Sequence, residues 1–176
     1  MNGNIVEVLY DIILSVNLNS NYDITYNSVT YMHTLSNING YIVRNWFDYD
    51  KCINNTLAIQ SGCVTYIKPQ SSMNDKLYTL TPQSKIGTEN ESFELILITK
   101  ANLNNIVLLG ELDKYVSVSQ YRFNNLNING NKISVDIIGA SNEIVNIAIL
   151  YPNGNDWLIY RYNVMLNADG MSTFII

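Results

Sequence analysis

The sequence predicts an all-β fold, a β-sandwich of about ten to twelve short antiparallel strands of jelly-roll or immunoglobulin-like kind. Two observations carry this prediction. Asparagine is the commonest residue, with 27 in a chain of 176, and most asparagines lie in short clusters. Runs rich in Ile, Val and Tyr separate these clusters, and such residues fit a pleated, half-buried surface. Turn-forming clusters that alternate with strand-forming runs are typical of β proteins.

Composition excludes one class of partner. Charged residues make up 14% of the chain, the net charge is -5 and the pI is about 4.7. Nucleic-acid binding depends on clustered Lys and Arg, which displace counterions from the phosphates. No such cluster exists in the sequence, so we expect no nucleic-acid partner.

The length suits a single β-sandwich domain spanning residues 1–176. The alternative is two small β modules split near residue 88, because Asn-Ile-Asn-Gly occurs at both 37–40 and 127–130. Residues 1–18 contain Glu7 and Asp11 and lack a basic start, so we expect no secretory signal. Nor does any apolar run reach the roughly 18 residues that a membrane span requires.

The two cysteines, Cys52 and Cys63, allow two interpretations. They would pair if neighbouring strands brought them together. In a chain of this length without a secretory signal, two cysteines are more often reduced. We therefore expect free thiols.

The first apolar segment, residues 5–16, is compatible with a strand or a helix. Alternate residues from Val6 to Leu18 share one face of a strand, whereas Asn4 and Glu7 would form the capping box of a helix. β-branched residues favour the strand. The further strands are expected at 22–31, with a bulge at Asn27 and Ser28, and at 41–47, 57–59, 63–68, 76–81, 93–99, 105–111, 115–123, 132–138, 144–151, 157–166 and 171–176.

Turns and loops separate these strands. Asn-Gly at 39–40 predicts a tight turn, and residues 152–156 predict a hairpin with a five-residue link. Residues 70–75 and 82–90 interrupt the pattern and are candidates for exposed, partner-contacting loops. Residues 157–166 are apolar on both faces, which is typical of a strand covered on both sides.

Catalytic groups are scarce. His33 is the only histidine and is expected to point outward from a strand, so neither a nucleophilic triad nor a zinc site is predicted. The acidic pairs Glu89 with Glu91 and Asp48 with Asp50 are interpreted as solvated charges. We expect no cofactor and no enzymatic activity.

One segment has the spacing of a calcium loop. Asn125, Asn127 and Asn129 alternate, Gly130 follows, and Asp136 stands six residues later. Only Asp136 carries a charge, whereas calcium sites use several carboxylates. The segment is better interpreted as an Asn-Gly hairpin, and no metal is predicted.

Aromatic residues are the remaining candidates for binding. Trp46 with Tyr49, and Trp157 with Tyr160, would suit a sugar-stacking face or a subunit contact, because each ring combines apolar area with a polar tip. The last residues, Phe174, Ile175 and Ile176, are apolar. We expect this final strand to pack in the sheet or against a neighbouring subunit.

These features together resemble β-rich structural proteins of tailed-bacteriophage virions, namely tail-fibre, baseplate, head-fibre or decoration modules. The resemblance is carried by the Asn-Gly hairpins, by the apolar terminal strand and by residues 146–160, NIAILYPNGNDWLIY, which look like the closing hairpin of fibre-tip sandwiches. It implies a non-enzymatic structural protein that contacts itself and other virion proteins, in the virion and, during assembly, in the host cytoplasm. The alternative is a carbohydrate-binding module that recognises a host glycan.

Overall fold

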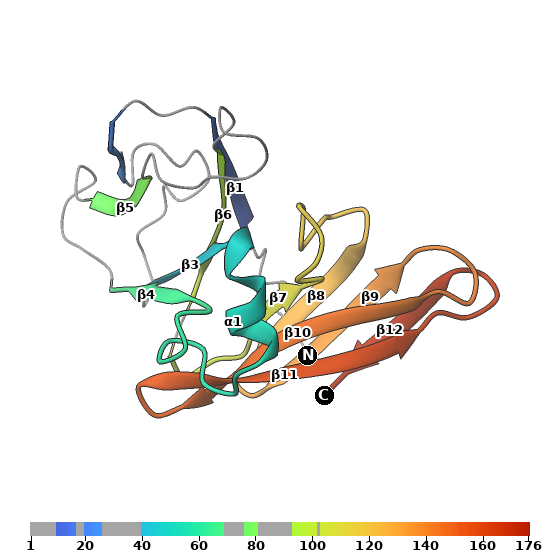
Figure 1. Ribbon diagram of the computed structural model, residues 1–176. Helices are drawn as coiled ribbons and strands as arrows, with labels where there is room; N and C mark the ends of the chain where they lie inside the picture. The colour runs from blue at the N-terminus through green and yellow to red at the C-terminus, as the bar shows by residue number, and fades with distance from the viewer. Residues whose placement is uncertain (1–9, 17–19, 26–39, 69–75, 81–92, 102) are drawn as a thin grey trace.

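The computed structural model describes residues 10–16, 20–25, 40–68, 76–80, 93–101 and 103–176. Within these ranges the chain forms twelve strands, one 3-10 helix and one short α-helix (Figure 1). The all-β prediction is confirmed. No helix in the described part of the chain is long and apolar enough to cross a membrane.

The N-terminal half contributes two sheets. A four-stranded sheet has the order β1-β6-β3-β4, and a two-stranded sheet joins β2 to β5. The bounds are β1 Tyr10–Val16, β2 Tyr22–Thr25, β3 Tyr41–Asn45, β4 Thr65–Ile67, β5 Lys76–Leu80 and β6 Phe93–Lys100. Between β3 and β4 lie the 3-10 helix η2, Trp46–Asp48, and the α-helix α1, Tyr49–Ile53.

The ambiguous first segment is a strand over residues 10–16. Tyr10 pairs with Thr99 and Val16 pairs with Phe93, in an unbroken antiparallel register with β6. Residues 5–9 lie outside the described residues. So do the bulge expected at Asn27 and Ser28, residues 36–39 of the first Asn-Gly turn, and the candidate loops 70–75 and 82–90.

The C-terminal half forms a sandwich of two three-stranded sheets. One sheet has the order β11-β10-β7 and the other β12-β9-β8. The bounds are β7 Val107–Gly110, β8 Phe123–Asn129, β9 Lys132–Ile138, β10 Ile144–Asn153, β11 Asp156–Met165 and β12 Met171–Ile175. The core between the sheets contains Ile106, Leu108, Phe123, Ile133, Val135, Ile137, Val145, Ile147, Ile149, Val164 and Leu166.

Strand β10 is buried on both faces from Ile147 to Leu150. Its second face packs against the N-terminal half. This second core contains Ile42, Cys52, Ala58, Cys63, Val64, Ala101, Val107, Leu109, Leu112, Ala148, Leu150, Trp157 and Ile159. The prediction that residues 157–166 are covered on both sides is wrong for part of β11, where Tyr160, Arg161, Asn163 and Met165 are exposed. A third cluster joins β3 and β6 to β2 and β5 through Ile24, Tyr41, Val43, Leu80, Ile96 and Ile98.

Tyr10 joins the two halves by a polar contact. Its hydroxyl donates a hydrogen bond of 2.6 Å to the carbonyl oxygen of Leu108 in β7. Burial raises the pKa of the Tyr10 hydroxyl well above its usual value, so the group stays protonated and remains a donor.

Three predicted strands differ from the structure. The strand expected at 115–123 is a loop, and β8 begins only at Phe123, because residues 111–119 fold back on themselves through a bond of 2.9 Å from Glu111 N–H to the Ser117 carbonyl. Residues 57–59 form a turn with a single bridge from Leu57 to Leu158. The strand expected at 41–47 ends at Asn45, whose side chain caps η2 by accepting from the N–H of Phe47 at 3.1 Å.

Both C-terminal hairpins turn at glycines with positive φ. Asn129 pairs with Lys132 across Gly130 (φ 59°), which confirms the Asn-Gly hairpin. The predicted five-residue link at 152–156 is shorter, because Asn153 pairs with Asp156 and leaves only Gly154 and Asn155 in the loop. Pro152 fits within β10 because β7 pairs only as far as Leu150.

Candidate functional site

A pocket of about 430 Å³ opens beside α1, on the face of β10 and β11 that carries the second core. In Figure 1, α1 lies close to β7 and β10, and the long β10–β11 hairpin passes below it. The lining residues are Tyr49, Ile53, Leu112, Asp113, Asn146, Ile147, Ala148, Arg161 and Asn163. They come from α1, from the loop after β7 and from the paired strands β10 and β11.

The floor of the pocket follows from the register of the hairpin. Asn146 lies opposite Asn163, and Ala148 lies opposite Arg161. Side chains two residues apart share a face of a strand, so these four residues continue the face that carries Leu150 and Ile159. Ala148 is 1% exposed and belongs to the second core, whereas the two asparagines are exposed. The pocket therefore lies where this face changes from apolar to polar.

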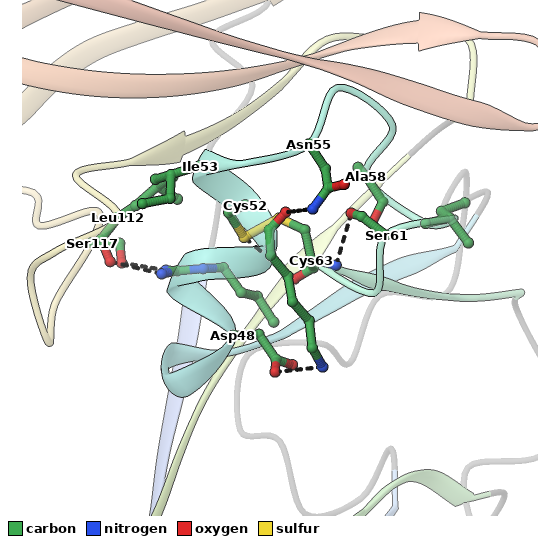
Figure 2. Close-up of a disulfide and its surroundings, with 12 residues drawn as sticks. Asp48, Cys52, Ile53, Asn55, Ala58, Ser61, Cys63, Leu112 and Ser117 are labelled. Carbon is green, nitrogen blue, oxygen red and sulfur yellow. Dashed lines mark hydrogen bonds and ion pairs between the residues drawn. A yellow bond between two sulfur atoms is a disulfide. The ribbon is translucent and has the colours of Figure 1, made fainter.

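Helix α1 forms one wall, although a five-residue helix has little stability of its own. Cys52 forms a disulfide with Cys63, with an S–S distance of 2.11 Å and both residues 0% exposed (Figure 2). The expectation of free thiols is therefore wrong. The thiols meet because the turn at 57–62 returns the chain beside α1, a fold-back that sequence spacing does not predict. Arg161 also donates to the carbonyl oxygen of Ile53, which joins the end of α1 to β11.

The turn at 57–62 is itself fixed to the β10–β11 hairpin by Asp156. Its carboxylate accepts from the N–H of Ile59 at 2.7 Å and from the N–H of Gln60 at 3.0 Å. A carboxylate that accepts from backbone N–H groups forms charge-assisted bonds, which are stronger than neutral ones. The chain that carries Cys63 is thus fixed to the sheet beneath the pocket.

The loop after β7 forms the second wall, and the buried side chain of Arg44 supports it. Arg44 Nη2 donates to the carbonyl oxygen of Leu112 at 2.7 Å, and Nη1 donates to Ser117 Oγ at 3.1 Å. Arg44 is 1% exposed and forms no ion pair within the described residues. Burial lowers the pKa of its guanidinium to about 10, while the charges of Asp48 and Asp113 act in the opposite direction. The two bonds attach the loop to β3, and breaking them would leave the buried guanidinium without these acceptors.

The pocket thus has an apolar half and a polar half. Figure 2 labels Ile53 at the end of α1 and Leu112 on the loop after β7. Leu112 belongs to the second core, and Ile53 packs against it. The polar half contains one cation, Arg161, one anion, Asp113, and two amides. These groups can donate and accept hydrogen bonds beside an apolar surface.

The four aromatic candidates separate in the structure. Tyr49 lines the pocket and is 37% exposed. Trp46 is half-buried and its ring centroid is 4.7 Å from that of Tyr115. Trp157 is 0% exposed and donates its indole N–H to the Asn105 carbonyl at 3.2 Å, so it is a core residue. Tyr160 is exposed and its ring centroid is 5.1 Å from that of Tyr151.

The terminal candidates belong to β12 and the residue that follows it. Phe174 is half-buried, with its ring centroid 5.0 Å from that of Tyr162. Ile175 and Ile176 are exposed, at 72% and 38%. Phe174 therefore packs within its own chain, whereas the side chain of Ile175 points to the other face and is the most exposed of the three.

The residues of the calcium-like segment form part of a sheet. Asp136 accepts from the Asn125 amide at 2.7 Å and from the Thr173 hydroxyl at 2.6 Å, and these two bonds hold its pKa below the usual range. Asn127 and Asn129 are exposed residues of β8. Within the described part of the chain, no group of three or more His, Cys, Asp and Glu residues is placed to hold a metal ion.

Of the other catalytic candidates, the structure describes Asp48 and Asp50, and neither lines the pocket. His33, Glu89 and Glu91 lie outside the described residues. Asp48 forms an ion pair of 2.7 Å with Lys51, and Asp50 is an exposed residue of α1.

Sequence reasoning missed most of the pocket. Asp113, Asn146, Arg161 and Asn163 were not candidates, although the two-residue period of 157–166 does place Arg161 and Asn163 on one face.

Comparison of the chain with protein-family models, with curated proteins and with solved structures gave no match.

Proposed function

We propose that the chain is a non-enzymatic structural protein of a phage particle and that it assembles through the open edge of β12. The observation that carries the proposal is the position of β12 at the end of the order β12-β9-β8, so that no described strand pairs with its outer side. The assignment to a phage particle depends on the resemblance of residues 146–160 to fibre-tip hairpins.

The backbone bonds identify which residues face the open edge. Ile176 and Ile133 exchange two hydrogen bonds, of 2.9 and 2.8 Å, so they form a hydrogen-bonded pair. Bonding alternates along an antiparallel strand, and therefore Thr173 and Ile175 direct their N–H and C=O groups away from β9. Met171 also faces away, but its N–H and C=O bond to Asn167. Thr173 and Ile175 thus have outward backbone groups to which no other described residue bonds.

The side chains at this edge do not protect it. Residues 171–176 carry no charged side chain, and Met171 and Ile175 are 51% and 72% exposed. Native proteins usually protect sheet edges with charges, prolines or bulges, because an unprotected edge pairs with another chain.

A second copy of the chain suits this edge. In an antiparallel pair related by a two-fold axis at Phe174, Thr173 would lie opposite Ile175 of the second copy. In this register the outward N–H and C=O groups of Thr173 and Ile175 form hydrogen bonds in both chains. The bonds of Met171 to Asn167 stay intact. The two three-stranded sheets would join into a continuous six-stranded sheet, an isologous contact.

The test is a substitution at Ile175, since this exposed side chain makes little contact within its own chain. Light scattering over a concentration series should show dimers or larger assemblies for the wild type. Ile175→Lys places a charge at the edge, and Ile175→Pro removes the outward N–H; both should shift the protein to monomer while circular dichroism stays unchanged. Deletion of 171–176 is less informative, because it also removes the packed Phe174.

Tyr121→Lys is the matched control. Tyr121 is 92% exposed and lies outside any strand, so the same charge there should leave assembly unchanged. A wild-type chain that is monomeric throughout the series, or a control that dissociates as fully as Ile175→Lys, contradicts the edge as the contact.

A further inference from the structure

The pocket beside α1 combines an apolar wall with converging polar groups, and we propose that it binds a neutral sugar ring of a glycan. Sugar binding here does not depend on the β12 contact. The pocket has a volume of about 430 Å³, which falls within the range of roughly 300–1,000 Å³ that is usual for small-molecule sites.

The apolar wall would contact the C–H face of a sugar. Tyr49 lines the pocket and is 37% exposed, and Ile53, Leu112 and Ala148 add apolar surface to the lining. An aromatic ring with a polar tip buries apolar area at low entropic cost and leaves its hydroxyl for hydrogen bonding.

The polar half supplies donors and acceptors in the same small area. Asn146 and Asn163 lie directly opposite each other, which places their Cβ atoms about 5 Å apart on one face. Each side-chain amide donates two hydrogen bonds and accepts two. Vicinal hydroxyl groups, which donate and accept alternately, match such a pair of amides.

The charges favour a neutral ligand. Arg161 and Asp113 carry opposite signs, so an anion would be attracted by one and repelled by the other, and a cation likewise. One N–H of Arg161 bonds to the Ile53 carbonyl, which fixes the guanidinium at the pocket wall. In this position Arg161 can donate to a sugar oxygen, and Asp113 can accept from a hydroxyl.

Both walls are fixed before any ligand arrives. The disulfide holds α1, and the bonds from Arg44 hold the loop of Leu112. A site that does not have to be ordered on binding loses less affinity to entropy. This matters for a sugar site, where each contact contributes little.

The experiment is NMR titration of the full chain with glucose, galactose, mannose, N-acetylglucosamine, lactose and chitobiose, with inorganic phosphate as a separate arm. We expect saturation transfer from the protein to at least one sugar, with chemical-shift changes at the amides of Asn146, Ala148 and Asn163.

Three variants test the contacts. Tyr49→Ala and Asn163→Ala should each weaken binding at least about tenfold, the effect of about 1.4 kcal/mol. Tyr49→Phe keeps the ring and should stay within about threefold of the wild type, which isolates stacking from the hydroxyl. Asn153→Ala is the matched control, because Asn153 is exposed at the tip of the same hairpin and lies outside the pocket.

Three outcomes overturn the proposal. The first is that no sugar in the panel perturbs the pocket amides at millimolar concentration. The second is binding that Asn153→Ala weakens as much as Asn163→Ala does. The third is binding of phosphate at these residues without binding of any sugar, which would assign the pocket to anions.

Discussion

Arg44 in β3 donates a hydrogen bond of 2.7 Å to the carbonyl oxygen of Leu112, a residue 68 positions later in the chain. The bond joins the four-stranded sheet to the loop that follows β7 and forms a wall of the pocket. The donor is a buried cation, so a change in the loop that breaks this bond would leave a buried charge without its acceptor.

The conservative substitution of Arg44 by Lys should destabilise the protein more than its substitution by Met. Arg44→Lys keeps the buried charge but loses the fork that reaches both Leu112 and Ser117, so we expect destabilisation by about 2–4 kcal/mol at pH 7. Arg44→Met loses the same bonds but removes the charge, and it should destabilise by less. Chemical denaturation at pH 7 measures both values.

The lysine variant provides an internal control. The buried ammonium group can lose its proton at high pH. The difference in unfolding free energy between Arg44→Lys and Arg44→Met should therefore become smaller between pH 7 and pH 10. A methionine variant that is the less stable of the two at pH 7 would contradict the stated cost of the buried charge.

The disulfide should supply much of the stability around α1. Closing a loop with a sequence separation of 11 restricts the unfolded chain, and a loop of this size is worth about 3 kcal/mol. Replacing both Cys52 and Cys63 with Ala should lower the free energy of unfolding by about this amount. Reductant should lower the unfolding midpoint of the wild type and leave that of the variant unchanged. Two reactive thiols per unfolded wild-type chain without reductant would disprove the bond.

Gly110 should not tolerate a side chain. Its φ is 72°, and a Cβ there would clash with the backbone carbonyl of Ser117. Gly154 has a similar φ of 63°, but nothing lies within 4 Å of its added Cβ. Gly154→Ala should therefore lower the free energy of unfolding by about 1 kcal/mol, through backbone strain alone. Gly110→Ala should cost at least about 2 kcal/mol more, since overpacking adds to the strain. Equal losses of unfolding free energy would rule out the close approach.

Glu143 should make stability depend on acid pH. The Arg122 guanidinium bonds both oxygens of Glu143 and, with the N–H of Ala140, lowers the pKa of the carboxyl to about 2. Because the folded pKa lies below the ordinary value of 4.5, the folded state binds fewer protons than the unfolded state. The stabilisation is therefore present above about pH 4.5 and is lost as the pH falls toward 2.

Glu143→Gln should flatten the fall in unfolding free energy between pH 5 and pH 2 and reduce stability at pH 7 by about 1 kcal/mol. Asp169→Asn removes an exposed carboxylate that takes no part in this network and should keep the wild-type slope. If Glu143→Gln retains the full wild-type slope, the acid sensitivity comes from other groups.

Local patterns determined much of the C-terminal half. Two-residue periodicity predicts β9, because this strand buries one face against the opposite sheet. Apolar runs predict β10 and β11, and β10 is buried on both faces from Ile147 to Leu150. The Asn-Gly sequence at 129–130 predicts its hairpin, because glycine adopts the positive φ that the turn requires. These features depend on neighbours in the chain, so a single sequence contains them.

Tertiary structure decided the remainder. Helix α1 is too short to have a sequence signature, and it is stable through its packing and through the bond between Cys52 and Cys63. The alternating residues at 115–123 resemble a strand, yet the buried Arg44 and the close approach at Gly110 fold that segment into a loop. Tyr49 and Asn163 share a pocket only because β10 and β11 return beneath α1. Each of these contacts joins residues that are distant in the chain, and their free energies depend on burial, which sequence order does not specify.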